Sequence, residues 1–221
     1  MAKPSQVKSK ARVADHGEVF TGEREVNAML DLVKQETERI DSRFLEPACG
    51  NGNFLAEILR RKLAVVGGRY ARNRVEYERY AVLAVSSIYG IDLLPDNVSE
   101  CRQRLFEIAD SAYAALYKAA ATEAPRQTIR YILSKNIVCG DALTLKVATG
   151  ELIVFCEWAL VRGSKFKRRD FTFSELLEPN ADSQLGLFQA AMTARERATR
   201  FIPTPVAEYP LTNFWELSSY G

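Results

Sequence analysis

The stretch that decides the fold is Phe44-Leu-Glu-Pro-Ala-Cys-Gly-Asn-Gly-Asn-Phe-Leu-Ala-Glu-Ile-Leu59. It starts with two apolar residues typical of a short buried strand, turns at Gly50 and Gly52, and continues as a helix with one apolar face. Strand, glycine turn and helix in this order form the first unit of nucleotide-binding α/β folds. The glycines let the backbone approach a ligand, and the start of the helix offers it free N–H groups.

An acidic residue changes the chemistry of this turn, because Glu46 and Pro47 stand directly before the glycines. A carboxylate at the tip of a strand repels a pyrophosphate, but it accepts hydrogen bonds from a cationic ligand. The pattern therefore favours a sulfonium amino acid over a dinucleotide. The order Glu-Pro-x-x-Gly-x-Gly-x-Phe, which ends at Phe54, resembles the S-adenosylmethionine (AdoMet) motif of adenine-N6 DNA methyltransferases, the M-subunit type of restriction systems.

This resemblance implies an α/β fold with a doubly wound, mainly parallel sheet of the Rossmann-like methyltransferase type, and it leaves the completeness of the sheet open. A second strand is expected to end at Asp92, where an acidic side chain bonds ribose hydroxyls in such folds. The alternative is that Asp92 only caps the helix that follows.

Two further motifs of the family have counterparts here. The third strand of these enzymes ends with Gly-Asp-Ala-Leu, whose Asp accepts from the adenine amine of AdoMet, and Asp141 and Ala142 match it. Gly-Asp by itself is a common turn. A Phe-Thr-Pro sequence closes over the methionine moiety in the family; Phe20 and Thr21 match, whereas Gly22 replaces the proline. Alternatively, Phe20 is a hydrophobic staple for the next helix.

The residues expected to bind AdoMet are therefore Phe20, Thr21, Glu46, Pro47, Gly50, Gly52, Phe54, Asp92, Leu93, Asp141 and Ala142.

The catalytic motif of the family is missing. An adenine methyltransferase carries Asn/Asp-Pro-Pro-Tyr/Phe at the tip of its fourth strand, where it holds the amine and stacks on the flipped base, and no such tetrapeptide occurs in this sequence. Residues 152–158 are expected to form the fourth strand, with Cys156, Glu157 and Trp158 at its tip, and 169–173 its hairpin partner. No catalytic residue is assigned.

A basic cluster follows in the expected hairpin turn. It could track the phosphate backbone of DNA, and the alternative is a solvated turn. Its members are Lys165, Lys167, Arg168 and Arg169.

Composition sets the outer limits. The 221 residues, 47% of them hydrophobic, suit one compact domain, and the net charge of +2 decides nothing about DNA. Four separated cysteines and one histidine predict no metal site, and the polar, basic N-terminus predicts a cytoplasmic protein without a membrane anchor. We expect a flexible basic arm over 1–15, the AdoMet-binding domain over 16–178, and a C-terminal helix near 184–200 with an irregular tail over 179–221.

Three functions are compatible with these patterns. The first is an adenine-N6 DNA methyltransferase of a restriction-modification or related defence system, which needs another protein subunit for the missing motif or for target recognition. The second is a non-catalytic AdoMet-binding or DNA-associated subunit. The third is a dinucleotide-dependent oxidoreductase, which Glu46 opposes.

Overall fold

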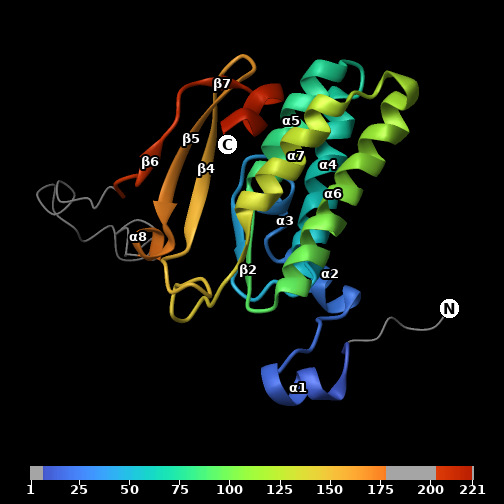
Figure 1. Ribbon diagram of the computed structural model, residues 1–221. Coiled ribbons are helices and arrows are strands. Elements are labelled where there is room, and N and C mark those ends of the chain that lie inside the picture. The colour runs from blue at the N-terminus through green and yellow to red at the C-terminus, as the bar shows by residue number, and fades with distance from the viewer. Residues whose placement is uncertain (1–6, 178–202, 221) are drawn as a thin grey trace, which may run out of the picture.

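The computed structural model describes residues 7–177 and 203–220 (Figure 1). At its centre lies a parallel sheet of three strands, in the order β1-β2-β3. The strands are β1 (Phe44–Glu46), β2 (Ile88–Asp92) and β3 (Ile137–Cys139). In the register, Glu46 lies opposite Gly90, and Asp92 lies opposite Cys139. The carboxyl ends of all three strands therefore meet at one edge of the sheet.

Four helices pack together on one face of this sheet (Figure 1). They are α4 (Asn53–Tyr70), α5 (Arg74–Ser86), α6 (Pro95–Tyr117) and α7 (Glu123–Asn136). Successive side chains of β2 point to opposite faces of the parallel sheet. Ile88 belongs to the large hydrophobic cluster with the helices, whereas Tyr89 and Ile91 belong to a second cluster on the other face. The short helix η1 (Lys118–Ala120) links α6 to α7.

The helices follow their apolar patterns. The proline at its first position starts α6, and its buried stripe is Val98, Cys101, Leu105 and Ala109. α4 runs through Gly67 and Gly68 to Tyr70. Two interior glycines cost about 1 kcal/mol each, but the adjoining turns bury Leu63 and Val66, which keeps the helix intact.

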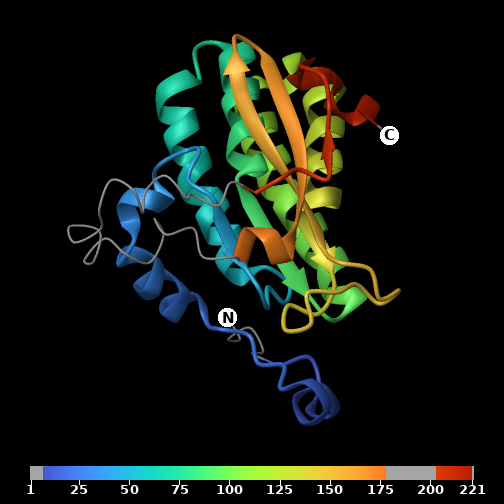
Figure 2. The same cartoon turned by 90° about the vertical axis from the view of Figure 1, so that its left-hand side faces the viewer.

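A second sheet of antiparallel strands covers the other face of the parallel sheet. The hairpin expected from the sequence is confirmed: β4 (Val154–Arg162) pairs with β5 (Lys165–Thr172) around Gly163, whose φ is 57°. Two short C-terminal strands, β6 (Ala207–Glu208) and β7 (Thr212–Asn213), also pair with β5. In Figure 2 this sheet lies in front, with the helices behind.

The expectation of a doubly wound parallel sheet is met only in part. The described chain is mixed α/β, with a parallel sheet of three strands and a separate antiparallel sheet. The expected fourth parallel strand, residues 152–158, instead contributes to β4. Its hairpin with β5 takes one edge of β4, and no described strand of the parallel sheet pairs with the other edge.

The termini also differ from expectation. Residues 7–15 were expected in a flexible arm, but α1 (Lys10–His16) is held to α6 by ion pairs of Lys8 and Arg12. Two helices, α2 (Glu23–Asp31) and α3 (Lys34–Thr37), lead into β1. At the other end, α8 (Phe173–Leu177) follows β5, and η4 (Phe214–Tyr220) packs on α7. The helix expected near 184–200 lies outside the described residues.

Candidate functional site

A cavity of about 500 Å³ opens at the carboxyl edge of the parallel sheet. This volume lies within the usual range for small-molecule sites. The wall is built by the segment before α2, the turn after β1, the start of α4, and the loops after β2 and β3. Every residue expected to bind AdoMet lines this cavity except Gly52. The fold thus brings together residues that are far apart in the sequence.

The two glycines of the turn have different tasks. Both adopt positive φ, 52° at Gly50 and 84° at Gly52. A Cβ at Gly50 would lie 2.9 Å from Cε1 of Phe20, so the missing side chain lets that ring lie against the turn. A Cβ at Gly52 would lie 2.6 Å from Sγ of Cys101 in α6, so this glycine serves packing and the start of α4.

Glu46 carries the least compensated charge of the site. Its side chain is half-buried, and this burial raises the pKa of its carboxyl, which one backbone hydrogen bond from Ala48 opposes. Within residues 7–177 and 203–220, no lysine or arginine forms an ion pair with it. A cationic ligand group in the cavity would supply the missing partner.

Asp92 holds the site together. Its Oδ2 accepts the N–H of Gly50 at 2.8 Å, and its Oδ1 accepts the N–H of Leu94 at 2.9 Å and Nδ2 of Asn97 at 3.1 Å. A carboxylate has about four acceptor positions, so Oδ2 retains one for a ligand hydroxyl. The alternative weighed from the sequence, that Asp92 only caps the following helix, is not what the structure shows: the N-cap of α6 is Leu94, and Asp92 accepts the N–H of that residue rather than one from the first helical turn.

Asp141 shapes the loop after β3. Its Oδ1 accepts the N–H of Leu143 at 2.8 Å, and its Oδ2 accepts the hydroxyl of Thr144 at 3.0 Å. These two bonds, the first more than the second, lower the pKa of the carboxyl. Leu93 and Leu143 line the same cavity with 58% and 94% of their surface exposed, so they offer apolar area to a flat ligand group.

Three polar residues of the cavity escaped sequence reasoning. Asn53 donates from Nδ2 to the carbonyl of Thr21 at 2.8 Å and accepts from Arg104 at 2.6 Å, which fixes the segment before α2 to the glycine turn. Glu18 and Asn97 are joined by a hydrogen bond of 2.6 Å. In the sequence, only the position of Asn53 directly after the glycine turn indicates that it lines the cavity. Asn97 is a polar residue inside an amphipathic helix, and such a residue gives no sequence signal for a site.

The basic cluster is not a turn and not one exposed patch. All four residues lie on β5, and alternate side chains point to opposite faces. Arg168 is buried and bonds both oxygens of Asp170, at 2.8 and 2.7 Å. Arg169 and Lys167 are paired with Glu157 and Glu208. Of the four residues in the basic cluster, only Lys165 forms no ion pair with another described residue.

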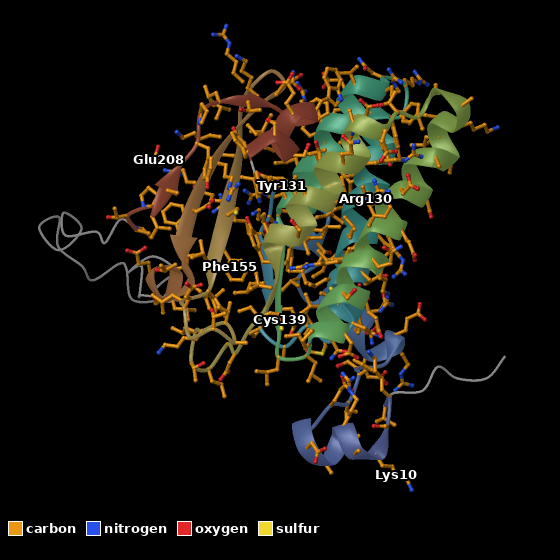
Figure 3. The ribbon with its side chains drawn as sticks, in the orientation of Figure 1. Lys10, Arg130, Tyr131, Cys139, Phe155 and Glu208 are labelled. Carbon is orange, nitrogen blue, oxygen red and sulfur yellow. The ribbon has the colours of Figure 1, made fainter. Side chains whose placement is uncertain are left out.

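The residues expected at the tip of a fourth strand do not reach the cavity. Cys156, Glu157 and Trp158 lie inside β4; Trp158 donates to Oδ1 of Asn136 at 2.9 Å, and Glu157 is paired with Arg43. Cys156 and Glu157 line a different cavity of about 440 Å³ beside β1. Figure 3 shows Phe155 of the antiparallel sheet above Cys139 at the end of β3.

No group of three or more His, Cys, Asp or Glu side chains within the described ranges is arranged to hold a metal ion. A helix with the length and apolarity needed to cross a membrane is likewise absent from 7–177 and 203–220. No protein-family model matches the chain, and neither a curated protein nor a solved structure matches it significantly.

Proposed function

We propose that the chain is the AdoMet-binding part of an adenine-N6 DNA methyltransferase of a restriction-modification or related defence system, and that a second polypeptide supplies the methyl-acceptor motif. One observation carries the proposal. Glu46 and Asp92 end two adjacent parallel strands, Asp141 follows the third by two residues, and all three line one cavity together with the glycine turn and Phe20. This is the arrangement that the sequence motifs of that family imply.

The charges of the cavity support AdoMet over a dinucleotide. The half-buried carboxylate of Glu46 lies where the glycine turn would otherwise receive a pyrophosphate, and two charged phosphates beside it would be repelled. The ammonium group of the AdoMet methionine moiety would instead compensate the carboxylate. A ribose hydroxyl fits the free acceptor position of Asp92, and the exposed leucines suit an adenine ring.

The strand order supports a missing partner. In doubly wound sheets of the order 3-2-1-4-5-6, the fourth strand pairs with the first. Here β1 pairs with β2, and no described strand pairs with its other edge. A strand added there would end beside Glu46, close to the cavity. This edge is therefore where a partner would bring an Asn-Pro-Pro-Tyr motif to the methyl group.

Calorimetry with AdoMet and NAD tests the pocket. We expect micromolar AdoMet affinity, about −8 kcal/mol, and weaker or no binding of NAD. Glu46→Gln should weaken AdoMet about tenfold or more, because hydrogen bonds to a charged group contribute roughly 1.5–3 kcal/mol. The exposed Glu38→Gln is the matched control. Tighter binding of NAD than of AdoMet, or equal affinity in Glu46→Gln, would contradict the proposal.

The second candidate is a non-catalytic AdoMet-binding or DNA-associated subunit. The absence of the acceptor tetrapeptide from the sequence favours it. The two candidates differ in the effect of a partner: the split enzyme gains methyl transfer when a polypeptide carrying Asn-Pro-Pro-Tyr is added, whereas the non-catalytic subunit binds AdoMet and never transfers its methyl group.

A further inference from the structure

Residues 7–22, here called the N-terminal strap, contain α1 and contribute 17–21 to the wall of the cavity. Its attachment is unusual for a wall, because none of its apolar side chains is buried. Val19, for example, is 60% exposed. Polar contacts therefore hold the strap in place. Figure 1 shows α1 standing off the body at the loop end of the sheet.

The polar contacts gather at the start of α6. Lys8 pairs with Asp96 at 3.1 Å and with Glu100 at 2.6 Å. Arg12 bonds Asp96 at 2.6 Å and also pairs with Glu18 of the strap at 2.5 Å. We call these five side chains the ionic latch. The guanidinium of Arg12 holds the pKa of the Asp96 carboxyl well below its usual range.

Asn97 connects the latch to the cavity. It is 1% exposed, and its Oδ1 accepts from Lys8 at 2.8 Å and from Arg12 at 3.2 Å. Its Nδ2 donates to Glu18 at 2.6 Å and to Asp92 at 3.1 Å. One buried amide thus joins both basic residues of the ionic latch, Lys8 and Arg12, to the carboxylate that holds Gly50. When the strap is closed, Lys8 and Arg12 therefore bond the same amide, that of Asn97, which donates to Asp92.

The strap also has places to bend. Gly17 ends α1 with a φ of 64°, and a Cβ at this residue would have no neighbouring atom within 4 Å. Gly22 precedes α2. The segment between them carries Phe20, which lies on Gly50, and Thr21, whose carbonyl accepts from Asn53. Rotation at the two glycines would lift this segment from the cavity without disturbing α2.

We propose that the N-terminal strap is a gate over the cavity and that the ionic latch keeps it closed. The identity of the gated ligand rests on the proposed function, so that ligand is AdoMet. Exposed ion pairs are individually weak and are screened by salt, since the Debye length falls from about 10 Å at 0.1 M to about 3 Å at 1 M. A strap held by apolar burial would respond little to salt, whereas this strap opens as the salt concentration rises.

Hydrogen exchange of the full chain without ligand tests the gate directly. Backbone amides of α1 should exchange about fivefold faster in 1 M than in 0.1 M NaCl. Arg12→Ala should exchange at the faster rate in both salts. The matched control is Lys10→Ala, which removes a cation from the same helix but lies outside the latch and is exposed (Figure 3). Exchange that responds neither to salt nor to Arg12→Ala would overturn the proposal.

Ligand kinetics separate the gate from the choice of ligand. Displacement of labelled AdoMet should be about fivefold faster from Arg12→Ala than from the original chain at 0.1 M NaCl, and Lys10→Ala should match the original chain. Equal dissociation from Arg12→Ala would overturn gating. If the original chain does not bind AdoMet but exchange shows salt-dependent opening, the proposed function fails and the gate stands.

Discussion

Oδ2 of Asp92 accepts a hydrogen bond from the backbone N–H of Gly50 at 2.8 Å, which ties the tip of β2 to the glycine turn after β1. One carboxylate therefore shapes the turn and faces the cavity at the same time. Because the carboxylate is held by the backbone that it organises, its position at the cavity is fixed. Under the proposed function, stability and AdoMet binding are therefore coupled at this residue.

Asp92→Asn should lower the free energy of unfolding by about 1–3 kcal/mol. An amide has one acceptor oxygen, so at least one of the N–H groups that now bond the carboxylate loses its partner or meets another donor. AdoMet affinity should fall as well. Urea unfolding and calorimetry measure the two effects, and Asp31→Asn, at a 63% exposed side chain, is the control. Unchanged stability would show that the hydrogen bonds of Asp92 are dispensable.

Gly52→Ala should destabilise the chain by about 1–3 kcal/mol through backbone strain and a contact with Cys101. The new Cβ would lie 2.6 Å from the sulfur, at a φ of 84°. Gly150→Ala is an informative control, because Gly150 has a φ of 90° but nothing within 4 Å. It reports the strain without the clash. If both variants lose the same stability in urea, the close approach to Cys101 contributes nothing.

Lys62 makes the free energy of unfolding depend on pH. Its amino group is fully buried, donates to the carbonyl of Ile40 at 3.2 Å and to the carbonyl of Ser42, and burial lowers its pKa to about 7. Between that value and about 10.5, the unfolded chain binds more protons than the folded one, so stability rises with pH.

The stability of the original chain relative to Lys62→Met should therefore increase from pH 7 to pH 10, by at most about 1.4 kcal/mol per pH unit. Unfolding in urea at several pH values measures it. Lys34→Met, at a 63% exposed side chain, should show no such trend. If the difference in the free energy of unfolding between the original chain and Lys62→Met stays constant or shrinks as the pH rises, Lys62 keeps its proton in the folded state.

Arg168→Ala should lower stability by about 3–5 kcal/mol, because it leaves the carboxylate of Asp170 buried without its partner. The same change at the exposed Lys165 should have an effect within about 0.5 kcal/mol. Thermal unfolding compares the two. A similar loss in both would show that the Arg168–Asp170 pair is not needed to hold β5.

The sequence predicted the cavity better than the sheets. The glycines, Glu46, Asp92 and Asp141 are local signals at strand ends, and parallel strands necessarily bring such ends together. The hairpin of residues 152–158 with 169–173 was predicted, but its separation from the parallel sheet was not, because periodicity identifies a strand without deciding which sheet it joins. The latch around Asn97 could not be predicted, because it joins residues that have no shared pattern and meet only in the folded chain.

The last prediction concerns methyl transfer. Moving a methyl group from AdoMet to an adenine amine needs acceptors that orient the nitrogen lone pair, and a displacement of about 1 Å can cost on the order of 100-fold in rate. Neither Glu157, which is paired with Arg43 and Arg169, nor Trp158, which is bonded to Asn136, reaches the cavity.

We therefore expect no transfer of tritiated methyl from AdoMet to mixed-sequence duplex DNA by this chain alone. Adding a polypeptide that carries Asn-Pro-Pro-Tyr and occupies the edge of β1 with which no described strand pairs should restore transfer. Replacing the Asn of that motif with Ala is the control, because it removes the acceptor but keeps the strand. Turnover by the 221-residue chain alone would mean that residues other than this tetrapeptide hold the amine. Since β1 ends at Glu46, restored turnover should also fall in Glu46→Gln when AdoMet is below its dissociation constant for the variant, because this change weakens the binding of the methyl donor.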